Sequence, residues 1–269
     1  MPIEVFAPIK PLGQEEFHAL DRRVMAVAFA VHNDLGRLLD EAVYKQEILV
    51  RCSELGILPA EREVRIRVSY EDFAKEYFMD LLFGCGVMLE AKTADAISPA
   101  HRSQAVNYLL LTGMNHGRLA NLRPDRVEHE FISTRLTPQA RRQFVVQDQE
   151  WHEVNEPSRF FKNRFIAILR EWGAFLDLNL YREATVHFLG GAERVCRNIE
   201  LLDGTRSVGV QSMNLLSDDT AFVISTFPSG ASRMSVHLRR LLQHTRLSHI
   251  QWVNIHHHTV EFATLSLSH

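Results

Sequence analysis

The chain has 269 residues, of which 46% are hydrophobic, so it can bury a substantial core as one large domain or as two small ones. No apolar run approaches the roughly 20 residues that a membrane-spanning helix needs, and no basic segment followed by a hydrophobic one opens the chain. We therefore expect a cytoplasmic protein without a membrane partner. The net charge of −3 gives no overall attraction for nucleic acid, so such binding would need a local basic patch.

The cysteines at positions 52, 85 and 196 are scattered and form no CxxC pair. This spacing argues against a disulfide framework and against a structural zinc site. We expect three reduced and buried thiols.

Apolar spacing predicts an ordered series of elements in the first half of the chain. After an extended segment over residues 1–14, helices are expected at 15–35 and 38–52, strands at 64–70, 79–83 and 87–92, a helix at 98–111, and strands at 117–122 and 127–133. Glu41 and Tyr44, three residues apart, share one face of the second helix.

The hairpin over residues 79–92 turns at Gly84-Cys85-Gly86 and carries three charged residues among apolar neighbours. Asp80 lies in its first strand, and alternation places Glu90 and Lys92 on one face of the second strand with Ala91 on the other. Burying such charges is costly unless they are paired or bind a metal. The hairpin alone fits either an internal salt bridge or a divalent-metal site with a lysine beside it.

Together, these motifs resemble the PD-(D/E)XK nuclease superfamily and, more narrowly, the bacterial proteins named for a GxxExxY signature. The resemblance covers roughly residues 20–133 and is carried by His32 with Leu35-Gly36, Glu41-Ala42-Val43-Tyr44, Asp80-Leu81-Leu82, Glu90-Ala91-Lys92, and Gln104 with Asn107-Tyr108-Leu109. One departure is that Leu38 stands three residues before Glu41, where the signature has glycine.

The resemblance implies a restriction-endonuclease-like mixed sheet and a nuclease that uses Mg²⁺, with Mn²⁺ as an alternative. Asp80 and Glu90 would bind the metal with help from Glu41 and the backbone carbonyl of Ala91, in agreement with the preference of hard cations for oxygen ligands. Lys92 would position or deprotonate the attacking water, for which a lowered pKa is expected beside a cation. It also implies that Gln104 and Tyr44 orient the site. The alternatives are that Tyr44 is a core aromatic residue and Gln104 a surface residue.

Polar residues 135–159 are expected to form a linker, and residues 160–269 a degenerate second copy of the first unit. Residues 173–181 can be laid on 36–44, 213–216 on 79–82, 223–226 on 89–92, and Asn254 on Asn121. In this alignment Leu178, Asn214, Ile224 and Thr226 replace Glu41, Asp80, Glu90 and Lys92, so no carboxylate pair remains. The alternative is that two α/β segments of similar order align by chance.

These observations predict an α/β protein with one active site per chain, which hydrolyses phosphodiester bonds in DNA in preference to RNA. The competing interpretation is a binding or regulatory module without catalysis. Arginines spread through the second half could contact phosphate or belong to solvated faces, and a homodimer or a protein partner fits either function. Residues 256–258 are three consecutive histidines, but successive strand residues point to opposite faces, which argues against a metal site.

Overall fold

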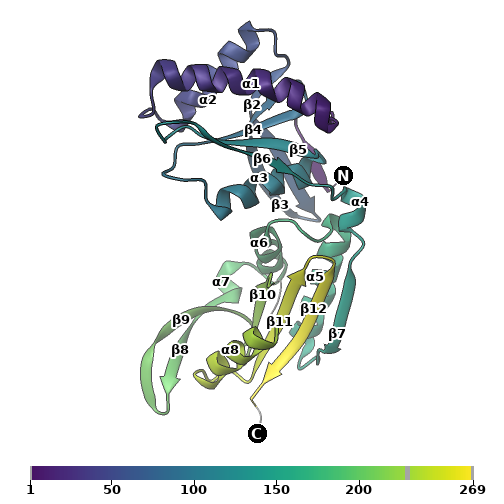
Figure 1. Cartoon of the computed structure of the whole chain (residues 1–269). Coiled ribbons are helices and arrows are strands. Elements are labelled where there is room, and N and C mark those ends of the chain that lie inside the picture. The colour runs from purple at the N-terminus through teal and green to yellow at the C-terminus, as the bar shows by residue number, and fades with distance from the viewer. Residues whose placement is uncertain (1, 228–230, 268–269) are drawn as a thin grey trace. The chain divides into compact units, whose positions relative to one another are not determined.

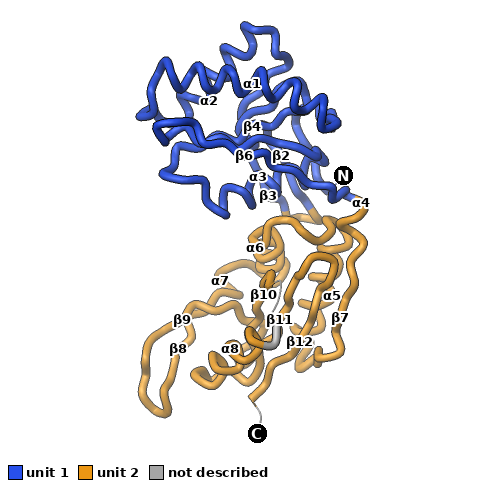
Figure 2. Tube along the Cα trace, in the orientation of Figure 1, with its two compact units in different colours: residues 1–69, 74–138 blue, residues 70–73, 139–269 orange. Residues whose placement is uncertain are grey.

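The computed structural model describes residues 2–227 and 231–267 and divides into two compact units (Figure 2). The first unit comprises Met1–Ser69 and Ala74–Pro138, and the second comprises Tyr70–Phe73 and Gln139–His269. Each contains a six-stranded mixed sheet with helices, so the expected α/β class is correct. Within residues 2–227 and 231–267, no helix has both the length and the apolar character to cross a membrane.

The first unit follows the predicted order of elements, with β2 and β3 beginning several residues earlier than apolar alternation indicates (Figure 1). Its elements are β1 (Ile3–Val5), α1 (Gln14–Leu35), α2 (Glu41–Glu54), β2 (Ala60–Tyr70), β3 (Phe73–Phe83), β4 (Val87–Lys92), α3 (Pro99–Thr112), β5 (His116–Asn121) and β6 (Glu128–Ser133). Ser98 caps α3 by accepting a hydrogen bond from the backbone N–H of His101 at 3.3 Å, as expected for a serine before a proline at the first turn.

The first sheet has the order β1-β2-β3-β4-β5-β6. β4 pairs antiparallel with β3 and parallel with β5, and α3 makes the crossover between β4 and β5. α1 and α2 pack on the face formed by Leu81, Leu89 and Ala91, all fully buried. Alternation along the two strands directs Asp80, Glu90 and Lys92 away from the face of Leu81, Leu89 and Ala91. α3 lies on the side of the sheet away from α1 and α2 (Figure 1).

The turn between β3 and β4 depends on two glycines. Gly84 and Cys85 both have positive φ, at 56° and 62°, which suits a tight hairpin turn. At Gly86 a Cβ atom would lie 2.6 Å from the carbonyl oxygen of Lys10 and 2.5 Å from the side chain of Leu12. Glycine is therefore required there by close packing, and the predicted hairpin is confirmed.

The second unit begins inside the segment that was expected to be a linker. Its elements are α4 (Pro138–Arg141), β7 (Val145–Glu150), α5 (Glu156–Trp172), α6 (Leu178–Phe188), α7 (Ala192–Val195), β8 (Cys196–Asp203), β9 (Arg206–Ser217), β10 (Thr220–Ser225), α8 (Ala231–Gln243), β11 (His249–His256) and β12 (Thr259–Ser266). β7 pairs parallel with β12 and forms an edge of the second sheet, although five of its six residues are exposed. Residues 135–159 are thus not a simple linker: polarity here marks an exposed edge strand.

The second sheet has the order β7-β12-β11-β10-β9-β8. As β4 does in the first sheet, β10 pairs with one antiparallel neighbour, β9, and one parallel neighbour, β11. The helix α8 makes the crossover between β10 and β11. Phe161 of α5 packs on Phe222 of the sheet, with ring centroids 4.9 Å apart. On the other face, Leu238 and Leu242 of α8 pack with Trp252. Apart from α4, α7 and the edge strands β1 and β7, the two units share the order helix, helix, three strands, helix, two strands.

The cysteines are all free, as expected, but only Cys52 is fully buried. Cys85 is partly exposed in the β3–β4 turn, and Cys196 is exposed at the start of β8. The expectation of three buried thiols is therefore wrong for these two, because both lie at the ends of strands.

Candidate active site

Asp80, Glu90 and Lys92 lie against one another on β3 and β4. The Lys92 ammonium is 2.8 Å from Oε1 of Glu90 and 3.7 Å from Oδ2 of Asp80. Oδ2 of Asp80 also accepts a hydrogen bond of 3.0 Å from the backbone N–H of Ala91, and Oε2 of Glu90 accepts one of 3.4 Å from the backbone N–H of Asp80. These bonds join the two strands through their side chains and fix both carboxylates.

A second lysine, Lys45 on α2, approaches the same carboxylates. Its ammonium is 2.9 Å from Oδ1 of Asp80, 2.7 Å from Oε1 of Glu63 on β2, and 3.5 Å from Oε1 of Glu41 at the start of α2. Three carboxylates from three elements therefore surround one ammonium. Lys45 and Asp80 are both buried, whereas Glu41 and Glu63 are partly exposed at the rim.

The pKa values of Glu90 and Lys92 are both raised in this cluster. Burial, followed by the charge of Asp80, raises the pKa of Glu90 to about 8. Burial acts to lower the pKa of Lys92, but the charges of Glu90 and Asp80 outweigh it, so that pKa is raised. The raised pKa is that of the metal-free site, whereas the lowering expected from the sequence applies to a lysine beside a bound cation. Lys92 is thus held as an ammonium group, which favours orienting and electrostatic roles.

Gln104 joins the cluster through Tyr108, one turn further along α3. Its side-chain amide donates a hydrogen bond of 3.2 Å to the Tyr108 hydroxyl, which donates one of 2.8 Å to the backbone carbonyl of Phe78. Tyr108 is buried, and burial with the charge of Glu90 raises its pKa. Gln104 is exposed, and its hydrogen bond to the buried Tyr108 places it near the cluster, since the charge of Glu90 acts on that phenol.

Tyr44 has a different environment from the other predicted site residues. Its hydroxyl donates a hydrogen bond of 2.5 Å to the carbonyl of Gly36 and accepts one of 3.3 Å from the N–H of Leu39. The side chain is fully buried and closes the turn between α1 and α2, where Leu38 is 78% exposed. The Tyr44 hydroxyl therefore bonds within this turn and not to the carboxylates, and the exposed Leu38 fits where the signature has glycine.

Sequence reasoning missed Lys45 and Glu63 as members of the cluster. Lys45 had a local signal, since it is four residues after Glu41 and so lies on the same helical face. Glu63 had none, because its side chain reaches the site from an irregular position in β2, where φ is 53°. A positive φ at a glutamate is uncommon and cannot be read from the pattern of apolar residues.

The comparisons with known proteins concern the part of the chain that holds this cluster. Residues 18–134 match a family model described as "PD-(D/E)XK nuclease superfamily". This part of the chain, which lies in the first unit, is therefore similar to that superfamily. The first unit has both the mixed sheet and the paired carboxylates with a lysine that its sequence predicted.

The other comparisons add little to this assignment. No curated protein matches the chain. A solved structure described as "Crystal structure of SSO0001" is similar over 45% of this chain, at 19% identity and a TM-score of 0.27. The matched part spans 58% of that protein's length.

The carboxylates of the first unit's cluster are of the ligand type that a hard divalent cation prefers, but two lysines already pair with them. Four carboxylates surround two ammonium groups, so the fully ionised cluster carries a net charge of −2; its acidic members are Glu41, Glu63, Asp80 and Glu90. Carboxylate and carbonyl oxygens are the ligands that Mg²⁺ and Mn²⁺ prefer. In residues 2–227 and 231–267, no group of three or more His, Cys, Asp or Glu side chains is arranged to hold a metal, because lysine ammoniums lie between these carboxylates.

Strand register places apolar and neutral residues at the corresponding positions of the second unit. Lys92 stands opposite Asn121, and Ser225 stands opposite Asn254. Counting from these pairs, Met213, Val223 and Ser225 occupy the positions of Asp80, Glu90 and Lys92. The sequence alignment, which matched Asn214, Ile224 and Thr226 with those residues, is therefore wrong by one position. Spacing along the chain alone does not show how the strands pair.

Arg182 of α6 has the helix position of Lys45 but different contacts. Like Lys45, it is the fifth residue of its helix, and its guanidinium donates hydrogen bonds of 2.8 and 3.2 Å to the carbonyl of Ile224. By register, Ile224 corresponds to Ala91, whose carbonyl is a predicted metal ligand. A guanidinium thus contacts the second-unit counterpart of that carbonyl.

Proposed function

We propose that the first unit is a metal-dependent nuclease that hydrolyses phosphodiester bonds, in DNA in preference to RNA, with one active site per chain. Asp80 and Glu90 would hold Mg²⁺ or Mn²⁺, with Glu41 and the carbonyl of Ala91 completing the ligand set. The bound cation supplies neutralisation of phosphate charge and activation of water.

The residues of this chain would divide the remaining work among them. Lys92, an ammonium group fixed by Glu90, would orient the attacking water and stabilise negative charge on the phosphate. Gln104 would contact the substrate from the rim of the site, with Tyr108 holding its amide in place. We propose that Tyr44 acts at a distance, by fixing the first turn of α2 and thereby Glu41.

The observation that carries this proposal is the contrast between equivalent hairpins. The second unit builds the same hairpin with Met213, Val223 and Ser225, and Met213 is buried there. A sheet of this order therefore does not require buried charges. Because burying two carboxylates and a lysine is unfavourable, their retention in the first unit favours a chemical role.

We also propose that the second unit is a degenerate copy of the first and belongs to the same lineage as the GxxExxY proteins. Two matched contact networks support this. Tyr181 donates to the carbonyl of Gly173 at 2.6 Å, as Tyr44 does to Gly36. Asn254 donates to Glu261 at 3.0 Å and to the carbonyl of Phe227, as Asn121 does to Glu128 and to the carbonyl of Ala94.

Purified protein incubated with supercoiled plasmid, single-stranded DNA and RNA tests the nuclease proposal. With Mg²⁺ or Mn²⁺ we expect nicked circles before linear product, since a single site cuts one strand at a time, and no cleavage in EDTA. Lys92→Ala should abolish cleavage. Lys10→Ala, an exposed lysine in the same unit, is the matched control and should cleave as wild type does. Absence of cleavage on every substrate, or equal cleavage by Lys92→Ala, contradicts the proposal.

The second candidate function is nucleic-acid binding or regulation without catalysis. Lys45 favours it, because its ammonium already lies among Asp80, Glu63 and Glu41 and would compete with a metal ion. Metal titration separates the two functions. A catalytic site should bind Mg²⁺ or Mn²⁺ with an affinity that Asp80→Asn abolishes, whereas a retired site should show no such binding.

A further inference from the structure

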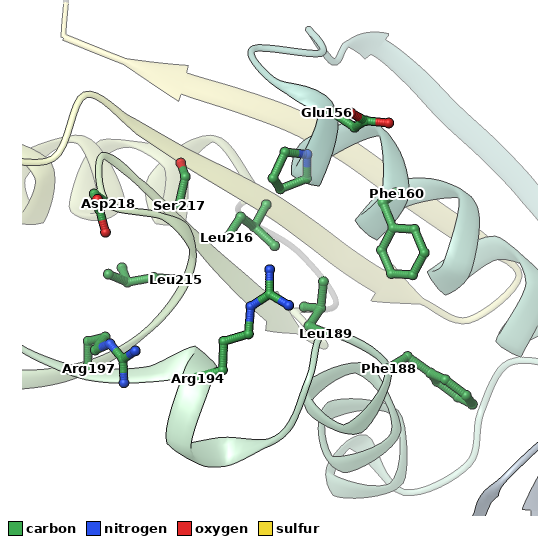
Figure 3. A pocket seen from close by; sticks show the side chains of 11 residues that line it. Glu156, Phe160, Phe188, Leu189, Arg194, Arg197, Leu215, Leu216, Ser217 and Asp218 are labelled. Carbon is green, nitrogen blue, oxygen red and sulfur yellow. The ribbon is translucent and has the colours of Figure 1, made fainter.

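The second unit contains a pocket of about 650 Å³ that the nuclease proposal does not use (Figure 3). Its walls come from the start of α5, the end of α6, α7, β8 and the end of β9. The volume falls in the range of small-molecule sites, roughly 300 to 1,000 Å³. The pocket combines two arginines and two phenylalanines with leucines of the β9 strand.

Arg194 directs its guanidinium toward the middle of this pocket, between Leu216 and Leu189 (Figure 3). A positive-φ glycine pair precedes it, with φ of 104° at Gly190 and 90° at Gly191. A Cβ atom on Gly190 would lie 2.8 Å from Cδ of Arg194, so glycine is what lets the arginine fold back over the turn. Across residues 2–227 and 231–267, the structure gives the Arg194 guanidinium no carboxylate and no hydrogen-bond acceptor.

The other charged groups of the pocket are already engaged or lie at its edge. Arg197 donates to the backbone carbonyl of Glu193 and keeps its charge. Glu156 forms an ion pair of 3.1 Å with Arg159. Asp218 is exposed, at the opposite end of the pocket from Phe160 (Figure 3). The centre of the pocket is therefore cationic.

Aromatic rings form the wall beside Arg194. Phe160 is 42% exposed, and Phe188 is partly exposed next to it (Figure 3). Arg164 packs over both rings, 5.5 Å from the centroid of Phe160 and 4.7 Å from that of Phe188, and so holds them in place. An exposed phenylalanine held beside an arginine without a partner is an arrangement that stacks a planar base and pairs with its phosphate.

We propose that this pocket binds a nucleotide, with the phosphate at Arg194 and the base against Phe160. Two sources share this chemistry: a free nucleoside monophosphate, or an unpaired nucleotide within a single-stranded nucleic acid. The proposal is independent of catalysis in the first unit, since every lining residue lies between positions 156 and 218.

Binding measured in EDTA separates this proposal from the nuclease proposal, because no metal is present. Calorimetry with AMP, adenosine and inorganic phosphate, and fluorescence anisotropy with labelled short single-stranded DNA and RNA, cover both sources. AMP should bind more tightly than adenosine or phosphate alone. If single-stranded DNA or RNA binds more tightly than AMP, the ligand is a nucleotide within a nucleic acid. If AMP binds and neither nucleic acid does, the ligand is the free nucleotide.

The variants test each half of the site. We expect Arg194→Ala to weaken binding about tenfold or more, from loss of charge-assisted hydrogen bonds. Phe160→Ala should weaken it about tenfold through lost stacking. Arg206→Ala, an exposed arginine at the β8–β9 turn of the same unit, is the control and should bind as wild type does. Arg194 and Phe160 are both exposed, so folding should survive, which thermal unfolding checks.

Three outcomes would overturn the proposal. These are no binding of any ligand in EDTA, unchanged binding in Arg194→Ala, or equal losses in Arg194→Ala and Arg206→Ala, which would indicate only diffuse charge attraction. If the protein cleaves nucleic acid but fails these binding tests, only the pocket proposal is wrong. If it binds AMP but cleaves no nucleic acid, only the nuclease proposal is wrong.

Discussion

The ammonium of Lys45 lies 2.9 Å from the carboxylate of Asp80, and both side chains are buried. One comes from α2 and the other from β3, so the ion pair ties the helix that carries Glu41 to the strand that carries the central carboxylate. In the metal-free protein, Lys45 neutralises a charge that the sheet interior could not otherwise hold.

Lys45→Met should therefore destabilise the metal-free protein. Removing one member of a buried pair leaves Asp80 uncompensated, which costs about 3 kcal/mol. The same change frees carboxylate oxygens, so Mg²⁺ should raise the melting temperature more in the variant than in wild type. Thermal unfolding with and without Mg²⁺ measures both effects. Lys10→Met is the control, and equal stability of the two variants without metal would contradict the role of Lys45.

Glu90 gives a pH dependence whose sign follows from its pKa. Burial and the charge of Asp80 raise this pKa from 4.5 to about 8 in the folded protein, so the folded state binds the proton more tightly than the unfolded state does. The resulting stabilisation is full below the unfolded pKa and is lost as the pH rises toward the folded value. In EDTA, the unfolding free energy of wild type should thus fall relative to Glu90→Gln between about pH 5 and pH 8. Urea denaturation across this window measures it, and a constant difference would argue against the shift.

Tyr44 and Tyr181, which each bond to a glycine carbonyl in a turn between helices, should contribute similarly to the unfolding free energy. Their substitution should affect stability more than cleavage, unlike substitution of active-site residues. Tyr44→Phe removes a hydrogen bond to Gly36, and Tyr181→Phe removes the equivalent bond to Gly173. Each should cost about 1 kcal/mol of unfolding free energy, because a backbone carbonyl loses the hydrogen bond that it accepts from the tyrosine hydroxyl. The rate of phosphodiester cleavage per folded molecule should fall only modestly in Tyr44→Phe, because Tyr44 positions Glu41 without contacting the substrate, whereas Lys92→Ala should abolish cleavage. A large loss of cleavage rate with unchanged stability would place Tyr44 in the chemistry.

The three thiols should differ in reactivity. Burial raises the pKa of Cys52 to about 12, and the side chain is fully buried, so little thiolate is accessible at neutral pH. We expect a thiol reagent to modify Cys196 quickly, Cys85 more slowly, and Cys52 only after unfolding in guanidinium. Counting modified thiols over time, with Cys196→Ser as control, tests this order. Rapid modification of all three in the native protein would contradict it.

Much of the first unit could be predicted because its signals are local. The β3–β4 turn follows from Gly84 and Gly86, the start of α3 from Ser98 and Pro99, and the shared face of Glu90 and Lys92 from strand alternation. The second unit was harder. β7 is polar because it is an exposed edge strand, so its composition resembles that of a linker, and only its pairing with β12 assigns it to the sheet.

The sequence by itself determined that Asp80, Glu90 and Lys92 occupy one hairpin, since spacing within a hairpin fixes which face each side chain takes. Only the tertiary structure decided that Lys45 and Glu63 join them, because those contacts span 35 and 18 residues and depend on how α2 packs against the strands. It also decided which residues of the second unit correspond to Asp80, Glu90 and Lys92, one position away from the sequence alignment. It further showed that Arg194 and Phe160 line one pocket. Contacts between distant elements are set by packing and strand pairing, which spacing along a chain does not encode.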